Sequence, residues 1–176
     1  MMTDLRYPIG RWQWEIAGDP ARRAGWIGQI AAAPAALRRA VDGLSPAQLN
    51  TPYRPSGWTV RQVVHHLPDS HLNAYVRSKL ALTEDTPTIK PYDEKRWAEL
   101  PDARGADPEV SLSLLDALHR RWVLLLEALA PDDFARPLHH LEIGALTVDQ
   151  VVSLYAWHSR HHVAHITALR EQKKWS

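Results

Sequence analysis

The chain has 176 residues, of which 45% are hydrophobic and 23% charged, which suits one globular domain with a sizeable core. The net charge is +1 and no long Lys or Arg run occurs, which argues against a broad nucleic-acid-binding face. The chain has no cysteine, which excludes disulfides, thiolate metal sites and a cysteine nucleophile. With neither a secretory signal nor an apolar stretch of roughly 18 residues, we expect a cytoplasmic protein without membrane contact.

The first predicted elements are an arm and a helix. Residues 1–18 contain one proline and two glycines and read as an irregular N-terminal arm. Asp19 and Pro20 are typical of a helix start, with the carboxylate at the N-cap and the proline at the first helical position. Hydrophobic residues then recur at spacings of three and four as far as Leu44, which predicts a helix that Pro34 bends.

Three more helices follow a short loop that ends at residue 58. The same periodicity predicts helices from Thr59 to Thr83, from Asp107 to Ala130, and from Thr147 onward. Pro68 lies inside the second of these four helices, where we expect it to interrupt and kink the helix.

Two connectors complete the chain, residues 84–106 and residues 131–146. We expect one short helix in the first connector, at 93–100. Four amphipathic helices of roughly 20–25 residues predict an all-α four-helix bundle, formed by residues 1–176 as a single domain. The first connector is long enough to travel the length of the bundle, so the second and third helices are expected to run parallel.

The fourth helix carries the densest chemical signal, with histidines at positions 158, 161, 162 and 165. His158 and His162 are one helical turn apart and project near the hydrophobic stripe, so their rings share an inward face. A histidine pair at this spacing is a common way to hold zinc or a similar ion. The competing interpretation is a pair of core histidines that bond only to backbone or water.

The second helix offers further candidates. His71 projects onto the inner face, His66 onto its flank and His65 nearly opposite, so periodicity alone favours His71 as a third ligand. Asp69 is a candidate ligand or partner of a ligand, although a solvated helix carboxylate is the simpler interpretation of it.

Two motifs resemble a known family. The segment WTVRQVVHHL at the start of the second helix and YAWHSRHH in the fourth are similar to the YfiT branch of the DinB/YfiT-like metalloenzymes, and the similarity extends from Leu5 to about Ile166. This resemblance implies a four-helix bundle with an overhand link between helices two and three. It also implies one divalent metal ion, Zn²⁺ or Ni²⁺, bound by His66, His158 and His162, and a homodimer. The resemblance therefore favours His66 over His71.

Three imidazoles leave a coordination position open, as catalytic zinc sites do. A water bound there is acidified to a pKa near ~7, which favours a metal-dependent hydrolase acting on a small molecule. The same position also suits a substrate thiolate, so the alternatives are a bacillithiol-type S-transferase and a non-catalytic metal-binding bundle. We expect His165 to shape the open side of the site and His161 to pack or to face a neighbouring helix. No general base stands out among Asp69, Glu142 and Asp149, and Ser70 and Ser159 lack triad partners.

Overall fold

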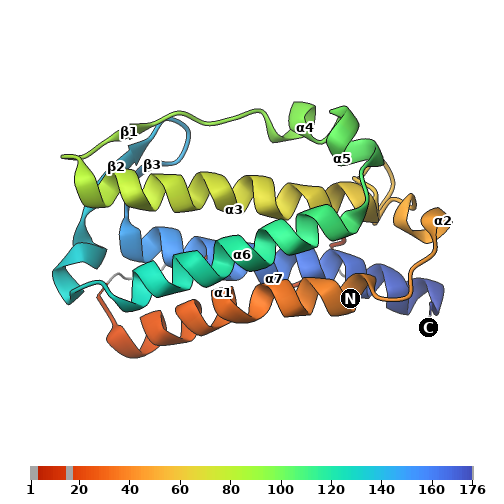
Figure 1. Cartoon of the computed structure of the whole chain (residues 1–176), viewed down its shortest axis with the longest axis horizontal. Helices are drawn as coiled ribbons and strands as arrows, with labels where there is room; N and C mark the ends of the chain where they lie inside the picture. Colours follow the sequence, from red (N-terminus) through yellow and green to blue (C-terminus); the bar gives the residue numbers. More distant parts are fainter. Residues whose placement is uncertain (1–3, 15–17, 176) are drawn as a thin grey trace.

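Four long helices form the body of the molecule in this computed structural model, which describes residues 4–14 and 18–175 (Figure 1). The predicted arm of residues 1–18 lies only partly within the described residues. The four helices are α1 (Pro20–Val41), α3 (Val60–Thr83), α6 (Pro108–Glu127) and α7 (Val148–Lys173). The predicted four-helix bundle is therefore confirmed.

Side chains fix where these helices begin. Asp19 caps α1 by accepting the N–H groups of Ala21 and Arg22, as its sequence signal predicted. Thr59 and Thr147 each form a capping box, with Gln62 and Gln150 respectively, at the starts of α3 and α7. The first residues of the two histidine-bearing helices are thus held by their own local sequence.

The helix directions follow from the long connector between α3 and α6. This connector returns along the length of the bundle, so α3 and α6 run parallel, and α1 and α7 run the opposite way (Figure 1). It contains β1 (Thr88–Ile89) and two short helices, α4 (Glu94–Trp97) and α5 (Pro101–Gly105). The short helix expected at 93–100 is present as α4, although it ends at Trp97, and Pro101 starts a second short helix that was not predicted.

A small sheet closes one end of the bundle and was not predicted. After a 3-10 turn, η1 (Pro131–Ala135), the chain forms β2 (Pro137–His140) and β3 (Gly144–Thr147), which pair antiparallel through a turn at Gly144 with φ of 91°. Thr88 of β1 pairs in parallel with His139 of β2. These strands are only two to four residues long and join two separate connectors, so hydrophobic alternation could not reveal them.

Neither internal proline interrupts its helix. α1 continues through Pro34 and α3 through Pro68, so the expected interruption at Pro68 was wrong. A proline removes one hydrogen bond from the helix, and the neighbouring residues Leu67 and His71 are fully buried on either side of Pro68. Tertiary packing of these residues holds the two halves of α3 together.

The bundle interior has two hydrophobic clusters with histidines between them. One cluster surrounds Trp122 and Tyr155 near the sheet, and the other surrounds Leu67 and Leu115 near the opposite end. His71 and His119 occupy positions on α3 and α6 between these clusters and are 0% and 1% exposed. The middle of the bundle is therefore polar, and each of its groups needs a hydrogen-bond partner or a ligand.

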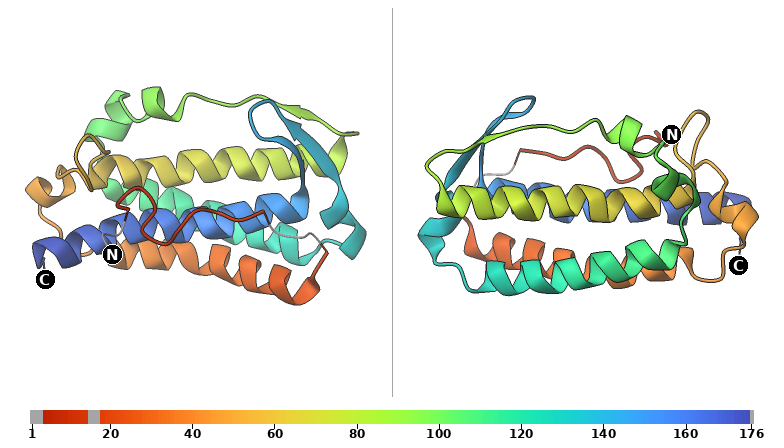
Figure 2. Two further views of the ribbon diagram at one scale, coloured as in Figure 1. Left: turned by 180° about the vertical axis from the view of Figure 1, so that it is seen from behind. Right: turned by 45° about the horizontal axis from the view of Figure 1, so that its top comes forward.

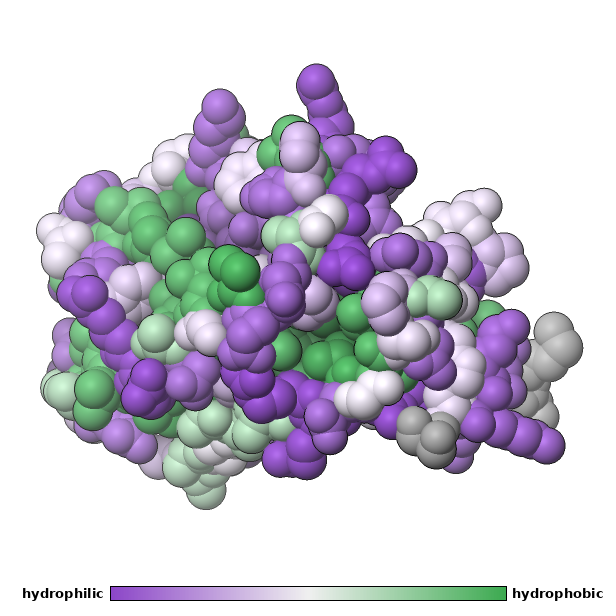
Figure 3. Space-filling view, turned by 45° about the vertical axis from the view of Figure 1, so that its right-hand side comes forward, coloured by the Kyte–Doolittle hydropathy of each residue, from purple (hydrophilic) through white to green (hydrophobic). Residues whose placement is uncertain are grey.

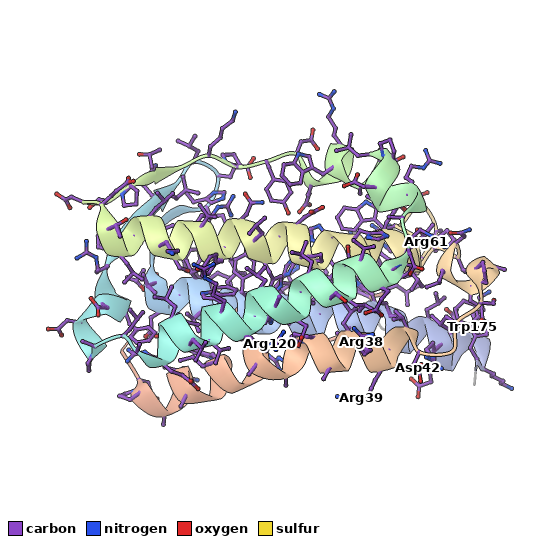
Figure 4. The ribbon with its side chains drawn as sticks, in the orientation of Figure 1. Arg38, Arg39, Asp42, Arg61, Arg120 and Trp175 are labelled. Carbon is purple, nitrogen blue, oxygen red and sulfur yellow. The ribbon has the colours of Figure 1, made fainter. Side chains whose placement is uncertain are left out.

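Ion pairs join α1 to its neighbours. The Arg23 guanidinium pairs with the buried Asp149 carboxylate at 2.7 Å, and Asp149 also accepts the Gly18 N–H. Arg38 lies between α1 and α6, where it donates to both carboxylate oxygens of Glu109 at 2.6 and 2.8 Å (Figure 4). Asp149 is thus occupied in packing, as expected for a carboxylate in the first turn of a helix.

The face drawn in Figure 3 combines hydrophilic side chains with hydrophobic patches. Exposed hydrophobic residues on α6 include Val110, Leu114 and Leu124. No helix in the described ranges combines the length and apolar character that crossing a membrane requires.

Candidate metal centre

Three imidazoles converge, one from the second turn of α3 and two from the middle of α7. His66 of α3 and His158 of α7 place their Nε2 atoms 3.3 Å apart, and the Nε2 atoms of His158 and His162 are 3.2 Å apart. One nitrogen from each of the three rings lies within 4.8 Å of the others. We call His66, His158 and His162 the outer cluster.

The spacing of these nitrogens fits a metal ion better than it fits hydrogen bonding. A tetrahedral ion with metal–nitrogen bonds of about 2.0–2.1 Å holds its ligand nitrogens about 3.3 Å apart. His158 Nε2 faces two other Nε2 atoms, and a neutral ring can place at most one proton on that atom. Three lone pairs directed at one point form the donor set of a zinc or nickel site.

Burial keeps the outer cluster neutral. It lowers the pKa of His66 to about 3, and it lowers the pKa values of His158 and His162 well below the usual value, with neighbouring imidazoles adding to the effect. Protons therefore compete weakly for the three nitrogens at neutral pH, which favours metal binding.

His71 and His119 lie behind the outer cluster, and we call them the inner pair. His71 Nε2 is 3.1 Å from His158 Nδ1, His71 Nδ1 is 2.9 Å from His119 Nε2, and His119 Nδ1 is 2.6 Å from the Ile30 carbonyl oxygen. His71 faces inward as its helical position predicted, but it contacts the rear nitrogen of His158. Sequence reasoning overlooked His119, although its place beside Trp122 on a hydrophobic stripe was a signal.

The remaining candidates on α3 point elsewhere. His65 contacts the Ser111 hydroxyl and the Ala106 carbonyl, so both of its ring nitrogens are occupied away from the outer cluster. Asp69 is half-buried, and burial raises the pKa of its carboxyl to about 6, but its oxygens are not among the converging atoms.

His165 and His161 line the approach to the outer cluster. The ring of His165 stacks on Tyr53 with centroids 4.0 Å apart, and its Nε2 donates to the Arg6 carbonyl. The ring of His161 stacks on Trp157 at 4.4 Å and lies 5.8 Å from Tyr7. His161 thus packs beside the N-terminal arm, which runs along α7 on the back of the molecule (Figure 2).

A cavity of about 430 Å³ opens onto the outer cluster. Its walls come from the arm, the 53–58 loop, α4 and α7. The Trp58 ring lies 4.6 Å from that of His66 and forms part of this wall. The basic and acidic residues that line the cavity, apart from histidines, are Arg6, Arg54, Lys95 and Glu94. Sequence reasoning missed all of them because they come from three separate segments, the arm, the 53–58 loop and α4.

A smaller cavity of about 170 Å³ reaches the other side of His158. Ser70 and Glu142, which the sequence analysis considered as a nucleophile and a general base, lie in its wall. Neither belongs to a nucleophile–base pair among the hydrogen bonds described. Glu94 lines both cavities, and burial raises the pKa of its carboxyl. Ser159 donates to the Tyr155 carbonyl within α7 and takes no part in either cavity.

Comparisons with known proteins identify relatives along nearly the whole chain. The profile of the DinB superfamily matches residues 29–166. A Bacillus mycoides protein and a Bacillus cereus protein, both provisionally named metal-dependent hydrolases, are 52% and 51% identical over 174 residues, which cover 99% of this chain and 100% of each relative. The solved structure of YfiT from Bacillus subtilis superimposes with a TM-score of 0.95 at 48% identity, covering 98% of this chain and 99% of that one. YfiT is described as a probable metal-dependent hydrolase with an unusual four-helix bundle topology.

Proposed function

The chain belongs to the DinB superfamily, and from this membership and its converging imidazoles we propose that it is a metal-dependent hydrolase. The observation that carries the proposal is the convergence of three neutral Nε2 atoms at one end of a cavity of about 430 Å³. A structural metal site is closed by its protein ligands and needs no such opening, whereas a catalytic site needs one so that the substrate can reach the ion.

His66, His158 and His162 would hold one divalent ion, for which Zn²⁺ is our first choice and Ni²⁺ our second. An ion bound by three imidazoles supplies a Lewis acid and lowers the pKa of a bound water to near ~7. Trp58 and Tyr53 shield the approach from bulk water, which strengthens electrostatic interactions there.

The cavity wall also indicates the charge of the substrate. Arg54 and Lys95 bring positive charge, Arg6 is paired with the Asp4 carboxylate, and Glu94 is the acid among the lining residues. A substrate with an anionic group beside its scissile bond fits this wall. Glu94 is our candidate proton acceptor, because partial burial raises its pKa toward the range useful for general base catalysis.

The test is a substrate screen with the zinc-loaded and nickel-loaded proteins. Carboxylate-bearing esters and amides and, in parallel, an epoxide and an alkyl halide are incubated with each form, with and without low-molecular-weight thiols. A hydrolase releases product without a thiol, and chelation abolishes the release. Turnover that requires a thiol and forms a thioether would replace our proposal by S-transfer, which an open metal site also supports.

Chelation also addresses a purely structural role. A structural metal ion contributes folding free energy, so removing it unfolds the protein. We expect the metal-free protein to keep its helical circular dichroism at 25 °C, because the two hydrophobic clusters on either side of the site do not involve the ion. Loss of the helical signal on chelation, together with no turnover in the screen, would contradict a catalytic site.

A further inference from the structure

The strongest unassigned feature is a row of hydrogen bonds that crosses the bundle behind the outer cluster. It runs from His158 on α7 to His71 on α3, then to His119 on α6, and it ends at the Ile30 carbonyl on α1. Each of the four long helices contributes one member. All three contacts are 3.1 Å or shorter between heavy atoms, within the usual hydrogen-bond range.

The carbonyl at the end of the row determines the direction of every bond. A carbonyl oxygen only accepts, so His119 Nδ1 must carry a proton and donate it to Ile30. A neutral imidazole has one N–H, so His119 Nε2 is an acceptor, and His71 Nδ1 must donate to it. By the same reasoning His71 Nε2 accepts, and His158 Nδ1 must donate to it.

The consequence appears at the far end of the row. Because His158 carries its proton on Nδ1, its Nε2 presents a lone pair to the outer cluster. The inner pair is completely enclosed, with His71 0% and His119 1% exposed, so a second proton on either ring would be a buried charge that lacks a carboxylate partner among the contacts described. Water cannot substitute for either ring of the inner pair.

We propose that His71 and His119 are positioning residues that fix the tautomer and ring orientation of His158, anchored on the Ile30 carbonyl. The proposal rests on the proposed metal site and adds two residues to it. His162 has no such support, because its Nδ1 is buried without a hydrogen-bond partner in the described part of the chain. The row therefore gives His158 a hydrogen-bonded support at its rear nitrogen that His162 lacks.

The first test needs no substitution. In metal-free protein with ¹⁵N-labelled histidine, two-bond ¹⁵N–¹H correlation spectra at pH 7.5 report which ring nitrogen carries the proton. We expect the Nδ1–H tautomer at His158, His71 and His119. A dominant Nε2–H tautomer at His158 would overturn the proposal, whether or not the protein is a hydrolase.

The second test compares two substitutions of His119, which does not itself touch the outer cluster. His119→Gln retains an amide N–H for the Ile30 carbonyl and an amide oxygen for His71, whereas His119→Met retains neither. Residues that hold the second ring nitrogen of a metal-bound histidine typically contribute 10–100-fold to metal affinity. We therefore expect His119→Met to bind Zn²⁺ about 10–100-fold more weakly in a chelator competition. We expect His119→Gln to stay within about threefold of the unsubstituted chain.

His65→Gln is the matched control, because it replaces another buried, hydrogen-bonded histidine that is not part of the row. It should leave both the affinity and the His158 tautomer unchanged. A folded His119→Met protein that keeps full Zn²⁺ affinity and the Nδ1–H tautomer at His158 would contradict the proposal. If both His119 variants fail to fold, the tautomers of the unsubstituted protein still decide the question.

Discussion

The outer cluster and the inner pair contain the same residue type in the same bundle, yet their ring nitrogens are used in opposite ways. Both nitrogens of His71 and of His119 have hydrogen-bond partners, at distances of 2.6–3.1 Å. The outer cluster instead directs three Nε2 atoms at one another, so the single lone pair of His158 Nε2 faces two neighbouring rings. Burial does not distinguish the groups, since His66 is 4% exposed and His119 1% exposed.

The difference teaches that the partners of a buried histidine, rather than its burial, indicate whether it is structural or a ligand. A row of hydrogen bonds that ends at a carbonyl can give both nitrogens of every ring within it a hydrogen-bond partner. A cluster in which imidazoles face only imidazoles has no such end, and an ion at its centre would give all three nitrogens a partner at once. Each prediction below tests one consequence of this contrast.

The largest expected effect concerns the outer cluster. His162→Ala should abolish tight metal binding, with a loss well above 100-fold, because two imidazoles remain where three converged. The helical circular dichroism should be retained. Elemental analysis after dialysis measures the bound ion, and His65→Ala serves as the control that should keep full occupancy. Full occupancy in the His162 variant would refute the assignment.

Acid should destabilise the metal-free protein through both groups. The folded-state pKa values, about 3 for His66 and about 4 for His119, lie below the ordinary value of 6.5, so the unfolded chain takes up protons first. Stability is therefore complete above about pH 6.5 and falls as pH drops toward 4. Each buried neutral histidine should cost about 1.4 kcal/mol per pH unit within that window.

Urea unfolding at pH 7, 6 and 5 measures this dependence. His119→Gln should reduce the slope by the contribution of one histidine, because glutamine does not titrate. The exposed His139 supplies the control, and His139→Gln should keep the original slope. An unchanged slope in the His119 variant would show that the inner pair is not held neutral by the fold.

A moderate effect is expected at the cavity wall in front of the outer cluster. Arg54→Ala should raise KM for an anionic substrate about 10-fold while leaving kcat and metal content nearly unchanged, since the lost interaction is with the bound substrate rather than with the ion. Arg39→Ala is the matched control, because Arg39 is an exposed arginine of α1 outside that wall (Figure 4). Equal KM changes in the two variants would contradict the assignment of Arg54 to the substrate site.

The smallest expected effect is at His165. Replacing this residue by alanine removes the stack on Tyr53 and the bond to the Arg6 carbonyl, so we expect a loss of a few fold in kcat/KM with the metal retained. Steady-state kinetics and elemental analysis of His165→Ala measure both. Loss of the ion in this variant but not in His158→Ala would instead identify His161 and His165 as the ligand pair.

The sequence predicted the long helices because their caps and hydrophobic spacing are local signals. It also predicted which face of α7 carries His158 and His162, since one helical turn separates them. The choice of His66 came from a family motif, because helical projection favoured His71. That projection placed His71 correctly inside the bundle, and the contact it makes there depends on where His158 arrives from another helix.

Features that join distant segments could not be predicted, because they too depend on where another part of the chain lies. The role of His119 depends on the Ile30 carbonyl, 89 residues away, and no periodicity reports such a contact. The cavity wall combines the arm with the 53–58 loop and α4, and the small sheet pairs strands from two connectors. Each arises only when the helices are packed together.

The separation of the outer cluster along the chain has a consequence for biosynthesis. His66 and His158 are 92 residues apart, and the arm reaches His165 across 159 residues. A ribosome-bound chain that lacks α7 therefore carries one of the three imidazoles and has no site with which to capture an ion. Metal acquisition must follow release of the C-terminal helix, so prematurely terminated chains cannot compete with the finished protein for scarce metal.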